Sequence, residues 1–84
     1  MFVDVNFFDS DFNLVLERLF VRKNKASLTR KVNDLKRFIS GPGFERFGPL
    51  QCVVYVNNSH YCDIRFDPNV YGKAVVFYVN PGSL

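Results

Sequence analysis

The sequence predicts an α+β fold with the order β-α-α-β-β-β, in which an antiparallel sheet of about four strands has two helices packed on one face. Three observations predict this fold. Apolar and polar residues alternate near the N-terminus, apolar residues follow a helical repeat in the middle, and three strand-like runs separated by turn-forming residues occupy the second half. The chain has 84 residues, and we expect residues 1–84 to form one domain.

The first two elements are predicted from residues 2–22. Residues 2–8 alternate between apolar and polar side chains, which is typical of a strand. The following letters DSD supply helix N-cap side chains, and apolar residues then recur at helical spacing, which predicts a helix over 11–22. Leu14 and Val21 lie off the apolar stripe of that helix, so a second strand in a hairpin is the alternative.

A second helix is predicted between Ser27, a candidate N-cap, and Gly41. Gly41 in a left-handed conformation and the following Pro42 are expected to end it. Asp34 and Arg37 are three residues apart on its polar side, where they can form an ion pair. Its apolar residues recur three and four apart and are expected to face the sheet: Leu28, Val32, Leu35 and Ile39.

Three strands are predicted in the second half, over residues 50–56, 60–66 and 73–79. The connecting letters NNS and DPNVYG are rich in turn formers, so the three strands should form an antiparallel meander. The last strand is apolar on both faces, which suggests a central position in the sheet.

The alternation within these strands also predicts which side chains face away from the helices. Cys62 and Ile64 should point toward the helices, and Tyr55, Tyr61 and Arg65 should lie on the other face, open to solvent or to a partner. An apolar open face of this kind is also compatible with a homodimer.

Charge is unevenly distributed along the chain. Residues 17–37 contain eight basic and two acidic residues, a net charge of +6, whereas the remainder has a net charge of −3. One face of the molecule is therefore expected to be basic, and it could contact phosphates or an acidic protein surface. This predicted basic patch comprises Arg18, Arg22, Lys23, Lys25, Arg30, Lys31, Lys36 and Arg37.

The stretch GPGFERFGP, residues 41–49, places two phenylalanines between Gly-Pro pairs and is expected to be neither helix nor strand. One interpretation is that the rings close the end of a small core. The other is that a stiff loop presents Phe44, Arg46 and Phe47 to a partner, because aromatic residues and Arg dominate interface hot spots. We expect one of the two rings to be buried and the other exposed.

No catalytic, metal-binding or cofactor-binding motif is found, which favours a non-enzymatic role without a cofactor. His60 is the sole histidine and lies two residues from Cys62, so a Cys–His nucleophile is a minor alternative. Cys52, His60 and Cys62 lack the spacing and the fourth ligand of a zinc site. Two free core thiols are the first expectation, and a disulfide across the hairpin is the alternative.

The predicted element order resembles that of small toxins of the RelE/ParE class, which run β-α-α-β-β-β at about this length. The resemblance concerns topology alone. Toxins of that class place basic and hydroxyl-bearing residues along the last strands and the C-terminus, where this chain offers Tyr61, Arg65, Lys73 and Tyr78. No catalytic residue is transferred from the class to this chain.

The function expected from the sequence is that of a small binding protein that occludes the surface of a protein partner. Compact chains without catalytic motifs are common in phages and mobile elements, so an inhibitor of a host or defence complex, of the anti-CRISPR class, is the expectation. A nucleic-acid-binding protein or a RelE/ParE-like toxin acting through the basic segment is the alternative. No apolar run is long enough for a membrane span, and we expect a cytoplasmic location, in the host if the chain is phage-encoded.

Overall fold

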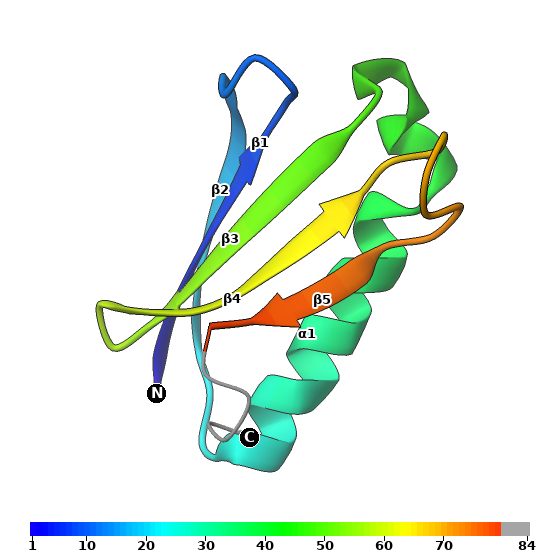
Figure 1. Cartoon of the computed structure of the whole chain (residues 1–84). Helices are drawn as coiled ribbons and strands as arrows, with labels where there is room; N and C mark the ends of the chain where they lie inside the picture. The colour runs from blue at the N-terminus through cyan, green and yellow to red at the C-terminus, as the bar shows by residue number, and fades with distance from the viewer. Residues whose placement is uncertain (80–84) are drawn as a thin grey trace.

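A computed structural model of the chain describes residues 1–79 (Figure 1). It contains a five-stranded antiparallel sheet, one α-helix and one 3₁₀-helix. The α+β class and the antiparallel sheet are confirmed, but the sheet has one strand more than expected and one of the two predicted α-helices is a strand. The elements are β1 (Phe2–Phe8), β2 (Leu14–Val21), α1 (Lys25–Ile39), η1 (Pro42–Phe47), β3 (Leu50–Val56), β4 (Ser59–Phe66) and β5 (Val75–Tyr78).

Strand β2 replaces the helix predicted over residues 11–22, so the alternative hairpin is confirmed and the order is β-β-α-β-β-β. The turn before β2 is held by Asp9, whose Oδ1 accepts hydrogen bonds from the backbone N–H groups of Asp11 and Asn13, both at 2.9 Å. A bulge leaves Val15 without a partner opposite it in β1. The bulge lets Val15 and Leu16, which are adjacent in sequence, both pack against the core, and the exposed Leu19 and Val21 are also apolar, so the segment lacks the alternation of a regular strand.

Helix α1 begins earlier than predicted. Its N-cap is Asn24, whose Oδ1 accepts a hydrogen bond from the Ser27 N–H at 2.9 Å, so Ser27 is the donor in the cap and not the cap residue. The helix ends at Ile39, and the expected left-handed glycine cap is wrong because Gly41 has a φ of −77°. Pro42 instead starts the short helix η1, where its missing N–H costs nothing.

The strand order in the sheet is β2-β1-β3-β4-β5 (Figure 1). The N-terminal hairpin pairs with β3 through β1, so β3 lies in the centre and β2 and β5 are the two edges. The prediction that the last strand is central is therefore wrong. Strand β5 is apolar on both sides because Val76 and Tyr78 pack against the core while Val75 and Phe77 lie on the opposite face.

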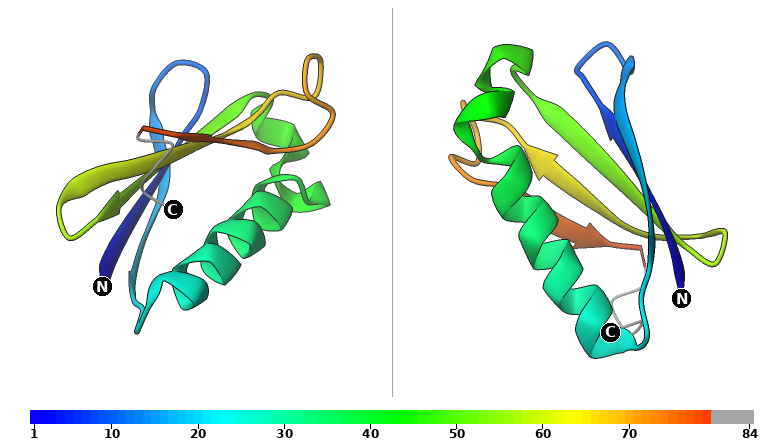
Figure 2. Two further views of the ribbon diagram at one scale, coloured as in Figure 1. Left: turned by 60° about the horizontal axis from the view of Figure 1, so that its bottom comes forward. Right: turned by 180° about the vertical axis from the view of Figure 1, so that it is seen from behind.

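Helix α1 covers one face of the sheet and leaves the other face open (Figure 2). Strand β2 contributes no fully buried side chain. No helix within residues 1–79 has the length and apolar character needed to cross a membrane. The core between α1 and the sheet consists of Val3, Val5, Phe7, Leu28, Val32, Leu35, Ile39, Leu50, Cys52, Val54, Cys62, Ile64, Phe66 and Ala74.

Candidate functional site

Three adjoining cavities line the edge of the sheet along β2, on the side of the helices, and together we call them the β2 groove. Their volumes are about 300, 310 and 210 Å³. The first lies between Val15 and Leu16 of β2 and the side chains of η1, the second begins at Arg18 and Phe20, and the third at Arg22. The helical layer supplies the facing wall of the groove: Ser27, Arg30, Lys31, Asp34, Leu35 and Phe38 of α1 and Gly43, Phe44, Arg46 and Phe47 of η1.

Phenylalanine rings line the half of the groove next to η1, and we call them its aromatic floor. The Phe44 ring lies 4.6 Å from the ring of Phe38, 6.5 Å from Phe7 and 5.9 Å from Phe47, measured between ring centroids. The guanidinium carbon of Arg46 lies 4.8 Å from the centre of the Phe47 ring. Phe44 and Phe47 are both half-buried, so the expectation of one buried and one exposed ring is wrong. The 41–49 stretch both closes the core and borders the groove.

In the other half of the groove, next to the first turns of α1, basic side chains surround the Phe20 ring. The Lys31 ammonium nitrogen lies 3.8 Å from the centre of the Phe20 ring, and the Arg22 guanidinium carbon lies 5.5 Å from it. Arg18 and Arg30 also line this half. The one acidic side chain among the residues that line the groove is Asp34, which is already paired with Arg37.

The structure divides the predicted basic patch between two flanks of the molecule. Lys36 and Arg37 lie on the other side of α1, where they share a shallow cavity with Lys73 near β5. Lys23 and Lys25 are exposed at the start of α1. Only part of the predicted basic patch therefore borders the groove. The part of the patch that lines the groove consists of Arg18, Arg22, Arg30 and Lys31.

The open face of the sheet carries part of the predicted interface. Tyr55 and Arg65 lie there, and the Arg65 guanidinium carbon is 5.0 Å from the centre of the Phe77 ring. Tyr61 does not lie there, contrary to the prediction. A bulge places both His60 and Tyr61 opposite Tyr55, and the Tyr61 ring turns to pack on Tyr78 at 5.8 Å and against the core. Burial raises the pKa of the Tyr61 hydroxyl.

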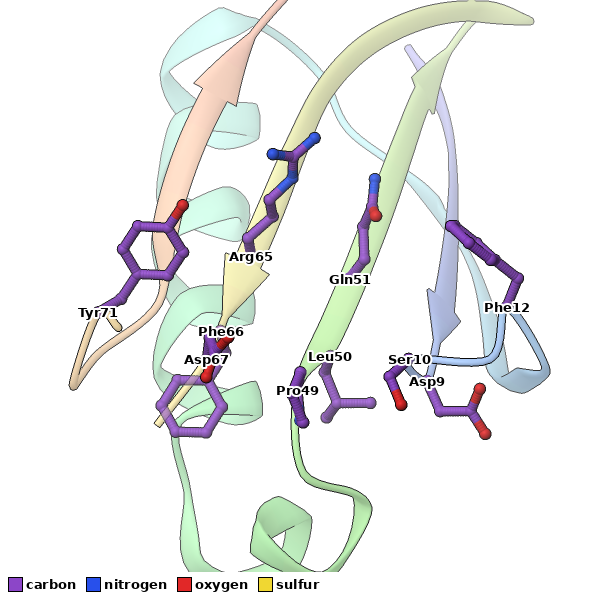
Figure 3. Close-up of a pocket in the computed structure, with 10 residues that line it drawn as sticks. All are labelled: Asp9, Ser10, Phe12, Pro49, Leu50, Gln51, Arg65, Phe66, Asp67 and Tyr71. Atoms are coloured by element: carbon purple, nitrogen blue, oxygen red, sulfur yellow. The ribbon is translucent and has the colours of Figure 1, made fainter. Parts of the chain in front are cut away.

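A cavity of about 240 Å³ lies on the open face, at the end of the sheet where β3 begins and β4 ends (Figure 3). Arg65 and Gln51, which are neighbours across the two strands, lie between the rings of Phe12 and Tyr71. Phe12 has a φ of 61°, a left-handed conformation that costs a non-glycine residue about 1 kcal/mol or more. This cavity faces away from the β2 groove.

The Cys–His and zinc alternatives fail on geometry. His60 Nε2 lies 2.8 Å from Asp63 Oδ1 on the open face, whereas Cys52 and Cys62 are buried on the helix face. Both thiols are free, and burial raises their pKa values, that of Cys62 to about 12. No group of three His, Cys, Asp or Glu side chains in the described part of the chain could hold a metal ion.

Comparison with protein-family models, with curated proteins and with solved structures finds no match to this chain. The candidate site is therefore defined by the geometry of this structure alone. Sequence reasoning missed three phenylalanines that line the β2 groove, Phe7, Phe20 and Phe38. A signal existed for Phe38, which lies beside the apolar stripe of its helix. No signal existed for Phe20, because the pattern of its segment predicts a helix where the structure has β2.

Proposed function

We propose that this chain is a binding protein that attaches to a protein partner through the β2 groove and thereby covers part of the partner's surface. The observation that carries the proposal is the combination of an aromatic floor and a basic rim along the β2 edge of the sheet, with which no strand of residues 1–79 pairs. Aromatic and Arg side chains of this kind dominate the energetics of protein interfaces. Phe38, which belongs to the aromatic floor, keeps 46% of its surface exposed, so apolar surface remains available for contact with a partner.

A protein partner is favoured over a nucleic acid by how the cations are arranged. Phosphate binding draws on several cations spread along one face. Here Lys36 and Arg37 lie on the other flank of α1, and the cations around Phe20 adjoin the exposed aromatic surface of Phe38, which a protein partner can cover. The topological resemblance to RelE/ParE toxins lends no support to the alternative, because it required a second α-helix at residues 11–22, which form β2.

Site-specific photo-crosslinking in the natural host cells tests the proposal. The photoreactive residue p-benzoylphenylalanine is placed at position 38, in the β2 groove, or at position 77, on the open face. Phe38 and Phe77 make a matched pair, because 46% and 39% of their surfaces are exposed and they lie on opposite sides of the sheet. We expect a protein adduct of defined mass from position 38 and none from position 77.

Charge reversal refines this experiment. Lys31→Glu should abolish the adduct at position 38, and Lys36→Glu, on the other flank of the same helix, should leave it intact. Adducts from position 77 alone would overturn the groove as the site. Adducts that disappear on nuclease treatment would replace the protein partner by a nucleic acid.

A further inference from the structure

The outer edge of β2 carries free hydrogen-bonding groups. Met1 and Arg22 form a hydrogen-bonded pair between β1 and β2: the Arg22 N–H donates to the Met1 carbonyl at 2.8 Å, and the Met1 ammonium donates to the Arg22 carbonyl at 2.6 Å. Such pairs alternate along an antiparallel ladder, so Glu17, Leu19 and Val21 direct their N–H and C=O groups away from β1. Within residues 1–79 no strand pairs with this edge.

The two faces of β2 offer different surroundings to a strand placed beside it. Arg18 and Phe20 lie on the helix face, opposite buried residues of β1, and border the β2 groove. Leu19 and Val21 lie on the open face and are 58% and 76% exposed. A neighbouring strand would therefore have basic and aromatic surroundings on its groove side. Its other side would lie beside the aliphatic Leu19 and Val21, with Glu17 next along the same face.

We propose that the partner segment is an extended acidic peptide that adds to β2 as an antiparallel strand, with acidic side chains toward the groove and apolar side chains beside Leu19 and Val21. This inference rests on the proposed function and names the chemistry of the occupant. Backbone hydrogen bonds to a free sheet edge supply affinity in such complexes, and the alternating side chains supply specificity.

Charge complementarity selects this occupant over a second copy of the chain. The groove side of the added strand would meet Arg18, Arg30 and Lys31. Asp34 is the one acidic residue that lines this half of the groove, and it is paired with Arg37. A second copy of β2 would bring another Arg18 into this basic surface, and like charges at close range oppose pairing. Carboxylates on alternate residues would neutralise the same cations.

Two synthetic peptides test the proposal on the full chain by isothermal titration calorimetry. The probe is an acetylated and amidated peptide of eight residues in which Glu and Val alternate, and its control alternates Lys and Val. We expect the Glu/Val peptide to bind and the Lys/Val peptide not to bind. Arg18→Gln and Lys31→Gln should each weaken binding about tenfold, and Lys36→Gln should leave it unchanged.

N-methylation of the peptide backbone tests strand addition directly. In an antiparallel pair, the bonded residues opposite Glu17, Leu19 and Val21 share their face, so they are the Val residues of the probe. N-methylation of the Val residues should abolish binding, and N-methylation of the Glu residues should leave it within about threefold. The bound peptide should also slow hydrogen exchange at the Glu17, Leu19 and Val21 amides.

Three outcomes would overturn the inference: binding of the Lys/Val peptide as tight as that of the Glu/Val peptide, equal loss from both N-methylated series, or no binding of the Glu/Val peptide. Loss confined to the N-methylated Glu series would overturn the antiparallel direction. A concentration-dependent dimer whose exchange protection covers the same three amides would identify a second copy as the occupant. If the peptides fail while adducts at position 38 persist, strand addition is wrong and the proposed function stands.

Discussion

The Lys31 ammonium lies 3.8 Å from the centre of the Phe20 ring and joins α1 to β2 across the groove. Within residues 1–79, no side-chain hydrogen bond or ion pair joins the two elements that carry these residues. A cation over an aromatic face is attracted by the negative charge of the ring's π-system. The same contact fixes the Lys31 charge at the mouth of the groove, where the proposed partner would meet it.

A double-mutant cycle measures this contact. Phe20→Leu keeps an apolar side chain without a ring, and Lys31→Gln keeps a polar side chain without a charge. We expect the two substitutions to be coupled by about 0.5–1 kcal/mol in the free energy of urea unfolding, which is the range for partly exposed cation–π pairs. Additive effects, with no coupling beyond error, would show that the contact contributes nothing to stability.

Phe44 is predicted to anchor η1 to the core. Its ring contacts those of Phe7, Phe38 and Phe47. Phe44→Ala should lower the free energy of unfolding by about 2 kcal/mol, below the value for a fully buried ring because Phe44 is half-buried. Arg46→Ala, at an exposed position in the same helix, is the control and should change it by less than about 0.5 kcal/mol. Equal effects of the two substitutions would contradict the anchoring role.

The N-cap of α1 is Asn24 in the structure, whereas the sequence pattern predicts Ser27, and stability measurements can distinguish the two. The Asn24 side chain accepts a hydrogen bond from the Ser27 N–H at 2.9 Å. Asn24→Ala should therefore cost about 1 kcal/mol in thermal or urea unfolding. Ser27→Ala keeps the backbone donor and should cost less than about 0.5 kcal/mol. The reverse order would restore Ser27 as the cap, as the sequence alone suggested.

The buried thiols predict a loss of stability at alkaline pH. Burial raises the pKa of Cys62 to about 12 from 9.0 and raises that of Cys52 in the same direction. Above about pH 9 the unfolded chain releases these protons while the folded chain keeps them, so the contribution of the thiols, fully present below pH 9, is lost as the pH rises. Urea unfolding under reducing conditions should show a loss of about 1.4 kcal/mol for each thiol between pH 8 and pH 10.

The control for this pH dependence is the double variant Cys52→Ala/Cys62→Ala. It starts from lower stability because it leaves cavities in the core, but its unfolding free energy should fall less between the two pH values. The remaining fall would come from Tyr61 and Tyr78, whose pKa values burial also raises. An unchanged pH dependence in the double variant would show that the thiols are not responsible for it.

Helix α1 and the first strands of the meander were largely predictable from the sequence. The bounds of β3 agree with the predicted 50–56, and the buried side of α1 consists of the predicted Leu28, Val32, Leu35 and Ile39. These elements are regular, and each has one apolar side and a clear turn at its end. Local periodicity therefore carries the necessary information.

The segments that sequence reasoning missed are those with an irregular backbone. In β2, the bulge at Val15 and the apolar residues on the open face together remove the alternation expected of a strand. In β4, the bulge opposite Tyr55 turns Tyr61 from the open face to the core. A single extra residue reverses the facing of every side chain beyond it, and no local pattern marks where it occurs.

By itself, the sequence determined the class of fold, the meander of β3 to β5, the core-facing stripe of α1 and the excess of positive charge between residues 17 and 37. Only the tertiary structure decided the order of the strands, and with it that β2 and β5 lie at the edges of the sheet. It also brought Arg18, Phe20, Lys31 and Phe44 into one groove and moved Lys36 and Arg37 to the other flank. The physical reason is that hydrophobic periodicity specifies which side of each element is buried, whereas the neighbour of that element depends on pairings between segments far apart in the chain.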